Sequence, residues 1–147
     1  MFKHILVPTD GSSLSLQAAK KAIAFAMATG ARITAFYAGP RYTVQVYGEF
    51  VPPDFVTPKE FEKQTRKTAE AHLGAVEAIA AAAGVDCTRH YAVSDSPWEA
   101  IIRTAKAKKC DLIFMASHGR RGLSALLLGS ETQKVLTHSR VPVLVHR

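Results

Sequence analysis

The sequence predicts a doubly wound, Rossmann-like α/β fold, in which helices cover both faces of a single five-stranded parallel sheet. Three observations favour this fold. Short apolar runs alternate along the chain with stretches in which apolar residues recur every three or four positions. Glycine or proline stands at most of the junctions between them. The 147 residues suit one domain, which we expect to span 1–147.

Five short apolar segments are the expected strands, and we expect them in the order 3-2-1-4-5. They are His4–Pro8, Ala31–Ala38, Asp86–Val93, Asp111–Ala116 and Val141–His146. Because strands alternate with helices, right-handed crossovers should join parallel strands. The ligand site of such a sheet lies beyond the carboxyl ends of the strands, where the strand order reverses. With the first and fourth strands adjacent, the loops that follow them meet at that point.

Four helices are expected between these strands. Capping residues, glycine stops and apolar stripes place them from Ser12 or Ser13 to Gly30, from Phe61 to Ala83, from Ser96-Pro97 through Ala105, and from Gly129-Ser130 through Leu136. Residues 40–58 contain several prolines and aromatic residues and show no helical period. We interpret this segment as a long surface loop, a candidate lid or partner contact.

Composition and charge restrict the class of protein. The formal net charge is +7, but lysines and arginines are mixed with glutamates along the expected helices, which indicates solvated helix faces. We therefore expect no nucleic-acid partner. The two cysteines, Cys87 and Cys110, form no C-x-x-C pair, and the N-terminal apolar run is too short for a signal peptide or a membrane span. We expect a cytoplasmic protein that does not contact membranes.

The candidate site is the glycine-containing stretch 116–135, which reads ASHGRRGLSALLLGSETQKV. It matches neither the Walker A pattern, nor the dinucleotide fingerprint G-x-G-x-x-G, nor the nucleophile elbow G-x-S-x-G. No histidines have the spacing H-x-x-x-H, and we expect no metal ligands. Spacing alone leaves two interpretations open. The glycines are turn and cap residues, or the backbone N–H groups at Gly129-Ser130 bind a phosphate opposite Asp10.

Four stretches of the sequence resemble the universal stress protein family: HILVPTDGS, LIFMASHG, GLSALLLGSETQKVL and the terminal VPVLVHR. The resemblance covers nearly the whole chain. The ATP-binding branch of that family carries the pattern G-x2-G-x9-G-[ST], which falls here on Ala116, Gly119, Gly129 and Ser130. Alanine at 116 departs from the pattern and would cost about 1 kcal/mol if the position had a positive φ. At a strand end we expect extended geometry instead, so nucleotide binding should survive.

The resemblance implies an adenine-nucleotide site. The residues that it implies are Pro8, Thr9, Asp10, Ala38, Met115, Ala116, Gly119, Gly129, Ser130, Glu131 and Thr132. By the same resemblance, Pro8–Asp10 line the adenine side, Ala38 offers backbone groups to the base, and Met115 flanks the nucleotide. Ribose and phosphates are held, chiefly through backbone N–H groups, by Gly119, Gly129, Ser130, Glu131 and Thr132. The ligand expected is ATP, or ADP or AMP, with or without Mg²⁺. We expect none of these residues to be catalytic.

The resemblance also implies a homodimer formed through the last strand, Val141–His146, whose edge would otherwise be exposed. The favoured function is a stress-response module that binds ATP and signals through its conformation or its partners. Two alternatives stay open. One is a slow ATPase, and the other is an interaction protein that binds no nucleotide and acts through the 41–58 loop and the dimer surface.

Overall fold

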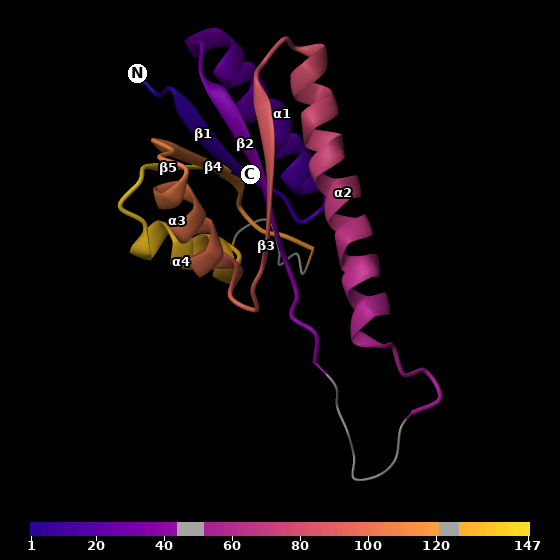
Figure 1. Cartoon of the computed structure of the whole chain (residues 1–147). Helices are drawn as coiled ribbons and strands as arrows, with labels where there is room; N and C mark the ends of the chain where they lie inside the picture. The colour runs from indigo at the N-terminus through magenta and orange to yellow at the C-terminus, as the bar shows by residue number, and fades with distance from the viewer. Residues whose placement is uncertain (44–51, 121–126) are drawn as a thin grey trace.

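The sheet has the predicted topology. The computed structural model describes residues 1–43, 52–120 and 127–147. Its five parallel strands lie in the order β3-β2-β1-β4-β5, which confirms the expected 3-2-1-4-5 (Figure 1). Their bounds are β1 His4–Pro8, β2 Arg32–Gly39, β3 Cys87–Val93, β4 Leu112–Ala116 and β5 Val143–His146. Because β1 has β2 on one side and β4 on the other, the strand order reverses at β1.

The central strands are apolar on both faces because helices cover both faces. In β1, Ile5 to Val7 have no exposed surface, and Leu112–Ala116 are all buried. The edge strand β5 begins two residues later than expected, at Val143. Pro142 has no N–H to donate to a ladder, although its carbonyl still accepts from the N–H of Ile113, 2.9 Å away.

Helices α1 (Ser13–Thr29) and α2 (Pro58–Ala82) cover one face of the sheet (Figure 1). Ser12 is the N-cap of α1, and its side chain accepts from the N–H of Ser15. The α1 helix ends at Gly30, where φ is 70°. Apolar residues of both helices pack with β1 and β2 in one core cluster, which includes Ile5, Ala22, Ile33, Leu73 and Val76.

The start of α2 lies earlier than the apolar stripe indicated. Thr57 and Glu60 form a capping box, and Pro58 occupies the first turn. The helix therefore begins at Pro58 rather than at Phe61, and the expected 40–58 loop ends one residue sooner. In its described parts, the Tyr42 hydroxyl donates to the carbonyl of Val56 at 2.6 Å. Residues 44–51 of that loop lie outside the described residues.

Helices α3 (Pro97–Ala107) and α4 (Ser130–His138) cover the other face (Figure 1). They pack a second core cluster against the sheet, in which Ile101 and Val135 meet Phe36 and Met115. No helix among the described residues is long and apolar enough to cross a membrane. The starts of α3 and α4 lie at the carboxyl ends of the strands, beside the point where the strand order reverses.

Candidate functional site

The loops that follow β1 and β4 meet through Asp10. Its carboxylate accepts the backbone N–H of Arg120 at 2.8 Å and, on its other oxygen, the N–H of Ser12 at 2.9 Å. A Cβ on Gly119 would overlap Asp10 Oδ2, so only glycine permits this close approach. The sequence predicted that Asp10 faces the glycine stretch across the sheet, and the structure confirms that placement.

Asp10 is held as a carboxylate. Burial opposes its ionisation, but hydrogen bonds from Ser12, from the Arg120 N–H and from Ser15 outweigh burial, so the pKa of Asp10 lies below its ordinary value of 3.8. Thr9 supports the same turn, because its hydroxyl lies 3.1 Å from Ser15 Oγ and accepts the Gly11 N–H at 3.2 Å. The loop after β1 is therefore held by hydrogen bonds among its own residues.

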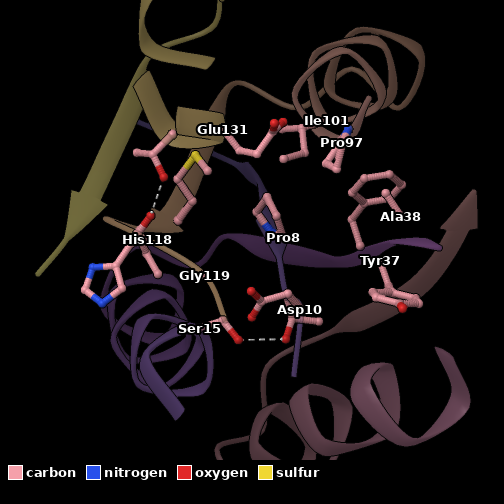
Figure 2. Close-up of a pocket in the computed structure, with 15 residues that line it drawn as sticks. Pro8, Asp10, Ser15, Tyr37, Ala38, Pro97, Ile101, His118, Gly119 and Glu131 are labelled. Carbon is pink, nitrogen blue, oxygen red and sulfur yellow. Dashed lines mark hydrogen bonds between the residues drawn. The ribbon is translucent and has the colours of Figure 1, made fainter. Parts of the chain in front are cut away.

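A cleft lies beside this contact and consists of two adjoining cavities, of about 180 and about 610 Å³. Figure 2 shows the residues that line the smaller cavity. The smaller cavity is mainly apolar and lies over β1, β2 and β4. The larger one lies over Asp10, Gly119 and the start of α4. Every residue that the family resemblance implied lines one cavity or both: Pro8, Thr9, Asp10, Ala38, Met115, Ala116, Gly119, Gly129, Ser130, Glu131 and Thr132. Whether these residues contact a nucleotide stays a prediction.

The start of α4 offers backbone donors to the larger cavity. The Gly129 N–H donates to the Ser117 carbonyl at 2.7 Å, and the Gln133 N–H begins the helical ladder by donating to the Gly129 carbonyl. Gly129 makes no side-chain cap. Among the described residues, the N–H groups of Ser130, Glu131 and Thr132 have no acceptor. Such unpaired N–H groups and the helix dipole attract anions.

Gly129 is required where the loop closes on itself. A Cβ there would lie 3.0 Å from the Cα of His118 and 3.3 Å from the Ser117 carbonyl oxygen. His118 borders both cavities, and its Nδ1 lies 3.2 Å from Ser117 Oγ. These contacts fit a histidine that shapes the turn.

Ala116 has the extended geometry expected of it. It is the last residue of β4, in register with His146, and it is not among the described residues with a positive φ. The Thr132 hydroxyl donates to its carbonyl at 2.9 Å, which ties the first turn of α4 to the end of β4. The alanine therefore introduces no backbone strain. Glycine is not needed at this position for conformational reasons.

Glu131 makes a contact that the sequence did not indicate. Its Oε2 accepts the backbone N–H of Trp98 at 2.9 Å, so its side chain caps the start of α3 (Figure 2). Lys134 lies 3.8 Å from the other oxygen, with both side chains substantially exposed. The rings of Trp98 and His138 are 4.8 Å apart at the same α3–α4 contact. Glu131 thus connects the two helix starts that border the cleft.

Helix α2 contributes a second unanticipated contact. The imidazole of His72 lies so close to Gly11, where φ is 76°, that a Cβ there would overlap the ring. Its Nε2 is 3.4 Å from Arg120 Nη2, and its ring meets Tyr37 edge-on at 5.2 Å. Burial and the nearby Arg120 lower the pKa of His72. Because the guanidinium can only donate, Nε2 accepts and the imidazole proton lies on Nδ1.

Other lining residues were not among the predicted site residues. They are Ser15, Phe36, Tyr37, Asp95, Pro97, Ile101, His118 and Arg120. Leu127, next to the start of α4, is 60% exposed, and residues 121–126 lie outside the described residues. Within the ranges that the structure describes, no three His, Cys, Asp or Glu side chains gather as a metal site.

Fold and cleft together define a doubly wound α/β protein with a ligand cleft where the strand order reverses. The model of the universal stress protein family matches residues 1–147, so the chain belongs to that family. It is 35% identical to a universal stress protein of Thermus aquaticus over all of both chains. It is 32% identical to one from Methanocaldococcus jannaschii, covering 99% of this chain and 82% of the other.

The fold is also similar to that of a solved structure that contains a ligand. A universal stress protein in complex with cAMP superposes with a TM-score of 0.70 at 25% identity, covering 99% of this chain and 97% of the other. The shared fold is therefore the doubly wound sheet described above.

Proposed function

We propose that this protein binds an adenine nucleotide in the cleft and acts as a stress-response binding or signalling module. One observation carries the proposal: the N–H groups of Ser130–Thr132, which have no acceptor among the described residues, and the Asp10–Arg120 contact border a cleft of the volume that small ligands occupy. The relative in complex with cAMP supports it, since cAMP carries adenine, ribose and phosphate. ATP, ADP and AMP share the adenosine part of that ligand.

In this proposal the two cavities take different parts of the nucleotide. The smaller cavity, whose walls include Phe36, Ile101 and Met115, suits the flat apolar base. The larger cavity, at the start of α4, suits ribose and phosphate because backbone N–H groups bind anions without needing lysine. Asp10 can accept from a ribose hydroxyl or an adenine amino group, since a carboxylate is only an acceptor.

Ser130 provides a matched test. Proline is compatible with the first residue of a helix, and Gly129, at φ −62° and ψ 151°, has the backbone that a residue before proline adopts. Ser130→Pro therefore removes one N–H with the helix start retained, whereas Ser130→Ala removes the hydroxyl and retains the N–H. By titration calorimetry with AMP, we expect proline to weaken binding about tenfold and alanine less than threefold. Equal losses, or a wild type that binds no adenine nucleotide, would contradict the proposal.

We propose binding without turnover. Phosphoryl transfer uses dedicated carboxylates that hold metal ions next to the phosphates. Asp10, the obvious acid of the β1 loop, instead uses its oxygens to accept the N–H groups of Ser12 and Arg120. Stoichiometric protein and ATP, incubated for hours, should release no phosphate above the rate without protein. If the wild type releases phosphate and the Asp10→Asn variant does not, the slow-ATPase alternative is favoured.

We also propose that two copies pair through β5. This strand ends the sheet, and Leu144 is 36% exposed on it. The Ile113 N–H donates to Pro142 and the Ser117 N–H to His146, so even-numbered residues of β5 face β4. Backbone groups of Val143 and Val145 consequently face the open edge, where the same strand of a second copy can pair with them.

A further inference from the structure

We propose that Glu131 is a specificity-determining residue, whose carboxylate disfavours the longer phosphate chains of adenine nucleotides. This inference rests on the proposed function and concerns the same cleft. Glu131 is the second residue of α4, so its N–H is one of the anion-binding donors while its side chain carries a negative charge beside them. The same residue therefore attracts a first phosphate and repels further ones.

The carboxylate has a fixed position. The Trp98 N–H, 2.9 Å from Oε2, directs the side chain toward the start of α3, where Pro97 and Ile101 also border the cleft (Figure 2). Thr132, the next residue, is anchored to the Ala116 carbonyl and is 2% exposed, so the first turn of α4 cannot rotate freely. Lys134 neutralises little of the charge, because an exposed pair at 3.8 Å is weak.

The described residues of the larger cavity carry more acidic than basic side chains. Among the described residues that line it, the carboxylates are Asp10, Asp95 and Glu131, and the only arginine or lysine is Arg120. Arg120 lies against His72. Asp95 accepts the backbone N–H of Arg41 at 3.0 Å and lies 3.9 Å from the Arg41 Nε, an exposed and therefore weak ion pair. The described part of the cavity wall thus has three carboxylates and one guanidinium, although the whole chain has a formal charge of +7.

The physical consequence depends on phosphate number. AMP places one phosphate near the N–H groups, whereas ATP brings additional negative charges into the same cavity. Coulomb repulsion over several ångströms, at the effective dielectric of a protein surface, changes an equilibrium constant by about fivefold or more per added charge. Removal of the Glu131 charge should therefore favour ATP over AMP.

The test compares the ratio of ATP to AMP dissociation constants in wild type, Glu131→Gln and Glu131→Met, by calorimetry in EDTA at low salt. ATP and AMP share the adenosine part, so a substitution that changes adenosine affinity alters both dissociation constants equally and leaves their ratio unchanged. Glutamine retains an acceptor for the Trp98 N–H, and methionine removes the charge without adding a donor. Glu99→Gln is the matched control, because Glu99 is an exposed acid in the first turn of α3 that lines neither cavity.

We expect both Glu131 variants to shift the ratio at least about fivefold in favour of ATP, and Glu99→Gln to leave it unchanged. Added salt should reduce the difference between wild type and variants. An unchanged ratio in both variants, or a shift with glutamine alone that reflects its new N–H donor, would overturn the assignment while nucleotide binding stands. If adenosine, AMP and ATP all fail to bind the wild type, the proposed function is overturned, and the assignment with it.

Discussion

The carboxylate of Asp10 lies 2.8 Å from the backbone nitrogen of Arg120 and joins two loops that are 110 residues apart in sequence. The two loops follow the central strands β1 and β4, so this hydrogen bond lies at the base of the cleft. A mutation that disturbs it should affect both the stability of the fold and the binding of a ligand.

Asp10→Asn should lower the free energy of unfolding by about 1–2 kcal/mol at pH 7, since hydrogen bonds to a charged acceptor are the stronger ones. In the folded wild type, the pKa of Asp10 lies below 3.8. The charged carboxylate therefore stabilises the folded state at pH values above 3.8, and this contribution is lost as the pH falls through the folded pKa. Urea unfolding at pH 7, 5, 4 and 3 measures the free energy of unfolding of the wild type and of Asp10→Asn. The two values should converge at the lowest pH. Asp54→Asn, at an exposed position outside the cleft, should cost less than about 0.5 kcal/mol.

Gly119→Ala should destabilise the protein by about 1–3 kcal/mol, because its Cβ would displace Asp10 Oδ2 from its hydrogen bond with the Arg120 N–H. Gly74 supplies the opposite case. It lies inside α2, where an added Cβ would be 3.7 Å from its nearest neighbouring atom, so Gly74→Ala should stabilise by about 0.5–1 kcal/mol. Thermal unfolding measures both changes. Equal effects at the two glycines would show that Asp10 does not restrict position 119.

Ala116→Gly should destabilise the protein by about 0.5–1 kcal/mol without strengthening nucleotide binding, because glycine weakens a strand and this position has no positive φ. Chemical denaturation and AMP titration measure the two quantities. A gain in affinity would mean that the alanine methyl group obstructs the cavity, so that the departure from the family pattern does weaken the site.

Val145→Pro should yield a monomer if β5 forms the interface. Proline removes the N–H that faces the open edge and leaves the ladder to β4 intact, because Pro142 and His146 carry the carbonyls that face β4. Light scattering measures the mass in solution. An unaltered dimer would place the interface elsewhere, and a monomeric wild type would refute the dimer.

The fold was predictable because its signals are local. Apolar runs and glycine stops indicated the alternation and the approximate bounds of every strand. The early start of α2 was also readable, since Thr57-Pro58-Lys59-Glu60 is a capping box with proline in the first turn. The later start of β5 follows from Pro142, which a purely apolar pattern overlooks.

The site was predictable only in part. Strand ends and glycine spacing predicted that Asp10 faces the glycine stretch after the fourth strand. The close approach of Asp10 to Gly119 itself is seen only in the structure. The contacts of Glu131 with Trp98 and of His72 with Arg120 depend on how α2, α3 and α4 pack. No local pattern encodes that packing, so these residues required the three-dimensional structure.

The most direct measurement is the change in backbone amide NMR shifts during titration with AMP. The proposed site predicts the largest changes at Ser130, Glu131 and Thr132 and in the Asp10–Gly11 turn. The amides of Gly30 and Gly84, at helix ends outside the cleft, should stay unchanged. Absence of any change, or changes that concentrate at Gly30 and Gly84 instead, would contradict adenine-nucleotide binding at the start of α4.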